Sequence, residues 1–350
     1  MTFRFAEGTR RDREYFSNMN TLLDLKESEI GLGVLDSTLP VVEMARHVWI
    51  DERAIETLCQ NWLEGKVESP AWDERYHWSD GTIRTATAIL VLDAWNFSFW
   101  PDPGKPKWRV KYKGKTLNGY MALAASVKRA IEEGYDLYDP ESLAALTMKD
   151  VKKIFRGQGE IPLLAKRLEH AREVGRRLLE KWDGDFSNML RAAEGSAVSL
   201  TELIVETFPS FDDTAIYRGR EVKLYKRAQI LPVDLMGGMK DEPLVQFHDI
   251  DRLTAFADYK IPQVLEAHGV LRYSPDLEAL LERQEGLGTG DPREVEIRAA
   301  MIWAVELIRR SLQAMGRSTP PFELDWMLWN LGQEPVENER PYHRTRTVFY

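Results

Sequence analysis

The chain reads QFHDIDRLTAFADYKIPQVLEAHGVLRY over residues 246–273, and this stretch predicts two helices separated by a turn. Asp249 or Asp251 is placed to cap the first helix, because a short polar side chain just before a helix accepts a hydrogen bond from its free backbone N–H groups. That helix would carry Leu253 and Phe256 on one side. The stretch therefore favours a helical fold.

A proline separates the two expected helices. Pro262 disfavours helical backbone at the residue before it, so the chain is expected to break or restart near residues 260–261. A second helix is expected over residues 263–268, and Gly269 follows it as a suitable terminating residue. The break leaves Asp258 near a helix terminus, beside Tyr259.

Asp258 permits two interpretations. It can cap the second helix, which is the commoner role for an aspartate at such a position. It can also serve catalysis, because a carboxylate at a helix terminus between apolar faces is well placed to face a developing positive charge. Spacing alone does not choose between the two roles.

Helical periodicity extends over most of the chain. Helices are expected over residues 16–25, 40–49, 51–65, 83–95, 120–133, 148–155, 164–182, 199–208, 275–285, 291–316 and 320–329. Residues 83–95 would also suit a buried strand, and residues 221–231 fit either an edge strand or a helix. Residues 108–115 alternate like a short hairpin strand.

The expected fold is mostly α. Helices and strands do not alternate in repeating units, which disfavours a doubly wound sheet. No flexible linker or internal repeat divides the sequence. Residues 1–350 are therefore expected to form a single compact helical domain with a small β element, on which residues 1–80 pack as an N-terminal helical extension.

Composition limits the possible partners. The 350 residues include 43% apolar and 29% charged side chains, with a net charge of −9. Stable nucleic-acid binding needs a basic face, which this balance argues against. The single cysteine, Cys59, cannot form a disulfide framework or a cysteine-based metal site. The single cysteine fits a reducing cytoplasm, and the sequence shows neither an apolar signal segment nor a membrane span. We also expect a monomer.

Several common catalytic motifs are missing from the sequence. The glycines at 157 and 159 do not follow a strand, and no Lys-Ser/Thr pair stands at the offset of a phosphate loop. The six histidines are scattered without paired metal-ligand spacing, and no Gly-x-Ser-x-Gly elbow occurs. We therefore expect neither a metal nor a cofactor.

Two segments combine aromatic rings with polar side chains. Residues 92–100 read LDAWNFSFW, so that Asp93 and Asn96 stand among four aromatic residues. Such a segment can stack on a flat ligand and hydrogen-bond to its edge, or it can be an apolar helix end. Residues 208–213 read FPSFDD and offer Phe211 and Asp212 either as a ligand edge or as a helix terminus with the next cap.

Two basic segments are candidates for holding a phosphate. Residues 225–229 read YKRAQ, in which Lys226 and Arg227 could bind a phosphate. Residues 342–346 read YHRTR and contain His343 and Arg344. Both segments could equally be solvated surface, as charged and terminal segments commonly are.

Eight segments taken together resemble the queuosine salvage protein family, the queuosine 5′-phosphate N-glycosylases or queuosine-nucleotide hydrolases. They run in order from about residue 85 to residue 350: LDAWNFSFW, GYMALAASVKRAIEEG, FRGQGEIPLLAKR, FPSFDD, YKRAQIL, LTAFADYKIPQVL, EVEIRAAMIWAVE and HRTRTVFY. The resemblance implies a helical fold related to the helix-hairpin-helix DNA glycosylases. It also implies release of the base queuine from queuosine 5′-monophosphate for salvage into tRNA.

The resemblance suggests roles for individual residues. In glycosylases of that kind an aspartate after the hairpin serves the sugar cation, and the match falls here on Asp258. The phosphate role falls on Lys226, with Arg344 and His343 as further candidates. A 7-deazaguanine has no N7 to protonate, so the departing base must be stabilised at its other edges. Further candidate substrate-binding residues offer hydrogen bonds or stacking rings: Asp93, Asn96, Asp212, Phe97, Phe211, Tyr259 and His248.

Two alternatives of different class remain. A glycosylase acting on DNA or tRNA would bind polynucleotide, and a non-catalytic protein would bind a queuosine nucleotide without cleaving it. The acidic net charge favours a mononucleotide over DNA or intact tRNA.

Overall fold

The computed structural model describes residues 31–65, 72–102, 104–333 and 339–350, and the helix expected over residues 16–25 lies outside these ranges. Helices dominate the described chain, which confirms the mostly α prediction. The α-helices are α2 (Val34–Glu43), α3 (Glu52–Glu64), α4 (Arg84–Ala94), α5 (Gly119–Glu132), α6 (Pro140–Ala145), α7 (Met148–Ile154), α8 (Leu164–Lys181), α9 (Phe186–Ala192), α10 (Ala197–Thr207), α11 (Lys226–Gly238), α12 (Lys260–Ala267), α13 (Pro275–Glu282), α14 (Pro292–Ala314) and α15 (Pro321–Leu331).

Strands form small pairs, and there are more of them than the single β element expected. Antiparallel pairs join β1 (Val48–Ile50) to β6 (Leu271–Tyr273), β2 (Arg109–Tyr112) to β3 (Lys115–Asn118), and β4 (Thr214–Tyr217) to β5 (Arg220–Lys223). A short parallel pair joins β7 (Gly286–Leu287) to β8 (Arg344–Thr345). None of the described pairs grows into a larger sheet, so helix packing carries the fold.

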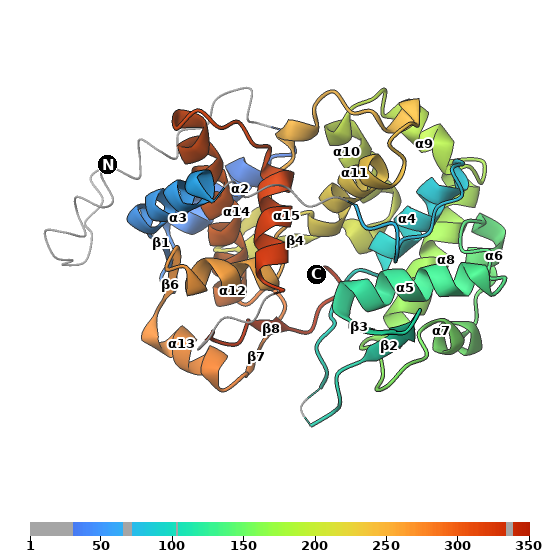
Figure 1. Ribbon diagram of the computed structural model, residues 1–350, viewed down its shortest axis with the longest axis horizontal. Helices are drawn as coiled ribbons and strands as arrows, with labels where there is room; N and C mark the ends of the chain where they lie inside the picture. Colours follow the sequence, from blue (N-terminus) through green and yellow to red (C-terminus); the bar gives the residue numbers. More distant parts are fainter. Residues whose placement is uncertain (1–30, 66–71, 103, 334–338) are drawn as a thin grey trace, which may run out of the picture.

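The helices gather into two halves (Figure 1). In one half α2, α3, α12 and α15 pack around α14, so that blue and red segments from far apart in the sequence meet. The other half contains α4 to α11, with α11 packed on α4 and α10. α14 is buried over most of its length, as expected for a helix that neighbours surround.

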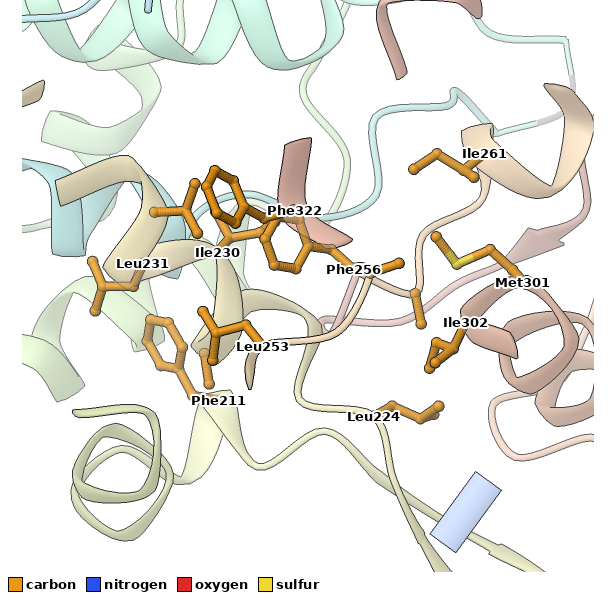
Figure 2. Close-up of a cluster of buried hydrophobic side chains, with 14 of the residues drawn as sticks. Phe211, Leu224, Ile230, Leu231, Leu253, Phe256, Ile261, Met301, Ile302 and Phe322 are labelled. Atoms are coloured by element: carbon orange, nitrogen blue, oxygen red, sulfur yellow. The ribbon is translucent and has the colours of Figure 1, made fainter. Parts of the chain in front are cut away.

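The prediction of a first helix within residues 246–273 is wrong. Its place is taken by a short 3-10 helix, η4 (Ile250–Arg252), followed by residues without helical structure up to Asp258. Leu253 and Phe256 are buried on this irregular segment (Figure 2). Asp249 instead caps a different helix, because it accepts hydrogen bonds from Ser196 Oγ and from Ala197 N at the start of α10, both at 2.6 Å.

The second expected helix is present but begins earlier. α12 starts at Lys260 rather than at residue 263, so Pro262 lies in its first turn. A proline is tolerated there because the first backbone N–H groups of a helix have no partner within the helix. The break near residues 260–261 is thus a helix start set by Asp258.

Three other segments were ambiguous or incorrectly predicted from the sequence. Of the helix expected over residues 40–49, only residues 40–43 are helical: α2 ends at Glu43, and Val48–Ile50 pair with β6 as strand β1. β-branched and aromatic side chains suit a half-buried strand once a partner strand is available. Residues 221–231 contain both alternatives, because β5 ends at Lys223 and α11 begins at Lys226. The apolar run 83–95 is the helix α4.

Three expectations stay predictions. They are the relation to the helix-hairpin-helix DNA glycosylases, the organisation of the whole chain as one domain, and the monomeric state. The described part of the N-terminal region does pack on the rest, since α2 and α3 both contact α14.

Candidate active site

A cavity of about 650 Å³ lies between the two halves. Its walls come from α5 and α11 on one side, and from α15 and the chain around the start of α12 on the other. The lining side chains that matter below are Asn96, Lys107, Tyr120, Lys226, Asp234, Asp258, Tyr259, Lys260, Asp325 and Tyr342.

Asp258 lines this cavity and also caps a helix. Its Oδ1 accepts hydrogen bonds from Lys260 N at 3.0 Å and from Ile261 N at 2.9 Å. Burial raises the pKa of the Asp258 carboxyl, and the charge of Lys226 together with the two N–H donors opposes that rise. The two roles considered from the sequence are therefore compatible at one residue.

Lys226 places a buried cation next to that carboxylate. It is the first residue of α11 and follows Tyr225, whose φ of 48° turns the chain into the helix. Its backbone N–H donates to Asp213 Oδ2, and Asp213 forms a buried ion pair with Arg298 of α14. Burial lowers the pKa of the Lys226 ammonium, whereas the charge of Asp258 favours its protonated form. Among the described residues its ammonium makes no hydrogen bond, so it remains available in the cavity.

A second aspartate faces the same cation. Asp325 on α15 accepts a 2.7 Å hydrogen bond from Phe256 N and so fixes the irregular segment before Asp258. Burial, reinforced by the charge of Asp258, raises the pKa of Asp325 well above its usual range. Burial therefore favours the protonated form of Asp325 more strongly than that of Asp258, whose carboxylate is supported by the Lys226 charge and by two backbone N–H donors.

Two more carboxyl groups lie at another part of the wall. Asp234 on α11 lines the cavity, and Asp93 of α4 is fully buried beside it. Burial is the largest cause that raises the pKa of both groups, to about 7 for Asp234. The two carboxyls also interact directly, which raises the pKa of Asp93 further.

A tyrosine and a histidine extend this pair. The Tyr120 hydroxyl lies 3.2 Å from Asp234 Oδ2 and 2.9 Å from His77 Nε2. His77 Nδ1 lies 2.7 Å from the carbonyl oxygen of Asp73. Burial lowers the pKa of His77 to about 4, so its imidazole is neutral at neutral pH. The four side chains form a continuous polar chain that opens into the cavity.

Aromatic rings and cations complete the walls. Tyr259 lies against Tyr342 with ring centroids 4.7 Å apart, and its ring meets Trp100 edge-on at 4.8 Å. Lys107 and Lys260 both line the cavity, and desolvation, followed by the charges of Arg109 and Lys260, lowers the pKa of Lys107. The Lys260 ammonium donates to Gln263 Oε1 at 2.7 Å and pairs with Glu339 at 3.7 Å, so an anion at this wall would meet both lysines and the Glu339 carboxylate.

Two buried arginines hold the turn that carries Asn96. Arg167 donates to the carbonyl oxygens of Trp95 and Phe97, and Arg227 donates to those of Asp93 and Ala94. The last carbonyls of α4 are thereby satisfied inside the protein, where unpaired groups would be costly. Arg227, considered from the sequence as half of a phosphate-binding pair, directs its terminal N–H groups to these carbonyls and to that of Ser210, whereas its Nε makes no hydrogen bond among the described residues.

The structure brings some of the predicted site residues together. Asp258, Lys226, Asn96 and Tyr259 line the cavity, and Asp93 lies directly behind Asp234. Other predicted residues do not line it: Phe97, Phe211, Asp212, His248, His343 and Arg344.

These other residues have surroundings of their own. Phe97 and Phe211 are core rings beneath the guanidinium groups of Arg167 and Arg227. His343 is buried, with Nε2 3.2 Å from the Tyr350 hydroxyl. Asp212 and His248 are exposed, and Arg344 lies in strand β8. We therefore leave these six residues out of the proposed site.

Several cavity residues were missed from the sequence, among them Tyr120, Asp234, Asp325, Lys107 and Lys260. A signal exists for two of them. Asp234 and Asp325 interrupt apolar helical runs, and a carboxylate on a buried helix face needs an explanation. Tyr120 and the two lysines stand in ordinary surroundings, so only the fold identifies them.

Two features of the described residues concern metals and membranes. No group of three or more His, Cys, Asp or Glu side chains comes together there in a way that could hold a metal ion. Within the same ranges, no helix combines the length and the apolar character needed to span a bilayer.

Comparison with known proteins gives consistent matches. A family model described as "Queuosine salvage protein" matches residues 76–350. A Sphaerobacter thermophilus protein named queuosine 5′-phosphate N-glycosylase/hydrolase is 50% identical over 319 residues, covering 91% of this chain and 98% of the relative. A Mus musculus protein of the same name is 36% identical, with 89% and 96% covered, and one from Schizosaccharomyces pombe is 32% identical, with 78% and 84% covered.

Proposed function

Because the chain belongs to the queuosine salvage protein family, we propose that it hydrolyses the N-glycosidic bond of queuosine 5′-phosphate and releases queuine. The observation that carries the chemistry is Asp258. This buried carboxyl lines the cavity, accepts two backbone N–H bonds and faces the Lys226 ammonium.

Cleavage of this bond builds positive charge on C1′ and on the ring oxygen of the sugar. An ionised carboxylate stabilises that charge strongly where water is excluded. Asp258 supplies the carboxylate, and its backbone bonds keep the side chain in place while the charge develops. Water then adds to C1′ as the base departs.

Lys226 has a different role from the phosphate contact expected from the sequence. The Asp258 carboxylate is the largest charge effect that favours the protonated form of the Lys226 ammonium. We therefore assign Lys226 to keeping Asp258 ionised. Without this cation, burial would leave a larger share of Asp258 protonated at neutral pH.

The 5′-phosphate belongs at the part of the wall that carries two lysines, one of which, Lys260, donates its backbone N–H to Asp258. Lys107 and Lys260 line the cavity there, and the charge of Lys260 acts on both Lys107 and Asp258. A phosphate held by Lys107 and Lys260 would place the attached sugar toward Asp258. Fixing the substrate through a remote charged group positions the reacting carbon.

Product analysis tests the function directly. The purified protein is incubated with queuosine 5′-phosphate and, separately, with unphosphorylated queuosine, and free queuine is measured by mass spectrometry. We expect queuine from the nucleotide at a rate well above that from the nucleoside. Bound but intact nucleotide would instead identify a non-catalytic binding protein.

A further inference from the structure

The Asp93–Asp234 pair retains a proton for structural reasons. Neither carboxyl oxygen of Asp93 receives a hydrogen bond from an N–H or O–H donor among the described residues. Its remaining partner is the carboxyl of Asp234, with which it interacts directly. Two buried carboxyls in contact cannot both be ionised at low cost, so the pair shares at least one proton.

The Asp73 carbonyl oxygen fixes where the hydrogens lie on the side chains of His77 and Tyr120, which link it to Asp234. The Asp73 carbonyl oxygen can only accept, so His77 Nδ1 must carry the hydrogen in their 2.7 Å contact. The buried imidazole is neutral, which leaves Nε2 without a hydrogen. The Tyr120 hydroxyl, 2.9 Å away, then donates to Nε2.

This assignment leaves the Tyr120 oxygen as an acceptor toward Asp234. Their 3.2 Å contact is a hydrogen bond in this arrangement only when Asp234 itself carries a proton. When Asp234 is ionised, the hydroxyl rotates to donate to Asp234 Oδ2, and His77 Nε2 loses its donor. The chain is therefore completely hydrogen-bonded while Asp234 holds a proton, and it still offers a donor after that proton has left.

We propose that Asp234 is the general acid that protonates the departing base, and that Asp93, Tyr120 and His77 are positioning residues for its proton. The proposal rests on the function proposed above. It gives the cavity two carboxyls with different tasks: Asp258 faces the sugar as an anion, and Asp234 faces the base as an acid. When their surroundings move the pKa values of two carboxyls apart, one active site can contain both an acid that donates a proton and an anion that stabilises positive charge.

The step balances as follows. The bond between C1′ and the glycosidic nitrogen breaks, and its electron pair passes to that nitrogen. The Asp234 proton moves to the same nitrogen, so queuine leaves neutral and Asp234 becomes a carboxylate that accepts from Tyr120. The oxygen of a water molecule bonds to C1′, the proton it loses passes to Asp258, and exchange with solvent returns both carboxyls to their starting states.

The surroundings of Asp234 suit an acid that works near neutral pH. The groups that act on its pKa are Asp93 from α4, Tyr120 from α5 and Lys226 from α11. Burial raises the pKa of Asp234 to about 7, and the other effects named for it lower the pKa. A general acid is most effective when its pKa lies near the working pH, and a base without N7 needs such an acid.

The test is the pH dependence of kcat/KM for queuosine 5′-phosphate in the wild type and in Asp234→Asn. The wild type should lose activity as pH rises through about 7, because the acid then loses its proton. Asp234→Asn should lower kcat by about 10²–10⁴-fold and abolish this alkaline limb. An alkaline limb that persists in Asp234→Asn would overturn the proposal.

Two further variants separate an acid from a merely structural side chain. Asp93→Asn still offers a donor to Asp234, so it should keep the alkaline limb and lose less than about tenfold in rate. Tyr120→Phe removes the hydroxyl that donates to Asp234 Oδ2 once Asp234 is ionised, and this donation lowers the pKa of Asp234, so the alkaline limb of the variant should move to higher pH. An unmoved limb in Tyr120→Phe, or equal losses in Asp93→Asn and Asp234→Asn, would contradict the assignment.

The outcomes distinguish this proposal from the one it rests on. If the wild type releases no queuine, the proposed function fails. Suppose that queuine is released and Asp258→Asn is inactive, but Asp234→Asn and Tyr120→Phe have the same pH profile as the wild type. Then only the assignment of Asp234 as the general acid is wrong.

Discussion

At the scale of single residues, the main feature is that Asp258 caps α12 and lines the cavity with the same carboxyl. Its Oδ1 takes the two backbone hydrogen bonds of the cap. A capping interaction typically contributes about 1 kcal/mol to stability, so loss of the carboxylate charge should affect stability and catalysis by separate mechanisms. The two effects can be resolved because the stretch contains a second capping aspartate.

Asp258→Asn should reduce kcat on the order of 10²–10³-fold while substrate still binds, because the amide cannot stabilise a cation as a carboxylate does. Steady-state kinetics and a binding measurement on the same variant test this expectation. Asp249→Asn is the matched control, since Asp249 is equally buried and caps α10 outside the cavity. A large kcat loss in Asp249→Asn, or near wild-type turnover in Asp258→Asn, would show that the cap rather than the charge matters.

Lys226→Gln should move the whole pH profile of kcat/KM to higher pH. The charge of Lys226 lowers the pKa of both Asp258 and Asp234. Without this charge Asp258 ionises only at higher pH, so the acid limb of the profile shifts to higher pH. Asp234 also keeps its proton to higher pH, so the alkaline limb shifts in the same direction. A profile that merely decreases in height, with both limbs in place, would speak against this role.

At the scale of elements, the β2–β3 hairpin changes the conclusion drawn from net charge. Residues 104–118 contain six Lys or Arg and no Asp or Glu. All six cations are exposed, and of them only Lys113 has an ion pair among the described residues, to Glu132 at 3.7 Å. The base of the hairpin reaches the cavity through Lys107 and Asn118. A chain of net charge −9 thus has a local basic surface at its cavity.

Lys111→Gln with Lys115→Gln should lower kcat/KM for the phosphorylated substrate about threefold to tenfold at low ionic strength, with kcat unchanged. The reason is that a basic surface steers anions toward a nearby site and salt screens this attraction. Kinetics at low and high salt measure the effect. The control is Arg218→Gln with Arg220→Gln, two exposed cations on the β4–β5 hairpin.

An equal loss in both double variants would contradict steering by this hairpin. A gel shift extends the test to the polynucleotide alternative. Wild-type protein that retains tRNA at physiological salt, and loses it in the Lys111 and Lys115 variant, would favour a nucleic-acid substrate over the mononucleotide.

At the scale of the whole molecule, the cavity joins two halves that are far apart in the sequence. Asp234 and Lys226 belong to α11 in one half, whereas Asp258 and Asp325 belong to the other (Figure 1). A ligand that contacts both walls binds the folded state and has no equivalent site on the unfolded chain. Occupation of the cavity should therefore stabilise the entire fold.

Queuosine 5′-phosphate should raise the melting temperature of Asp258→Asn. This variant is used because its expected low turnover leaves the nucleotide intact during the measurement. At a free concentration of 100 times Kd the gain is about 2.7 kcal/mol. Differential scanning calorimetry measures it, and unphosphorylated queuosine at the same concentration should give a smaller shift. No shift with the nucleotide at saturating concentration would mean that it does not occupy a site made by the fold.

Much of the secondary structure was predictable because it is local. The helices expected over residues 51–65 and 148–155 are present as α3 and α7, and Asp51 and Thr147 cap them through hydrogen bonds to neighbouring residues. The failures depend on distant partners. Residues 48–50 became a strand because β6 lies beside them, and residues 253–258 stayed irregular because Asp325 and the core hold them in place.

The sequence by itself determined the mostly α fold, the family and the candidate aspartate at residue 258, because periodicity, caps and motifs are properties of neighbouring residues. Only the tertiary structure decided which polar groups share the cavity: it brought in Asp234, Tyr120 and Asp325 and left out Asp212, His343 and Arg344. The physical reason is that burial and charge coupling depend on packing between segments far apart in the chain. The same aspartate can be a cap, an acid or an anion according to what surrounds it.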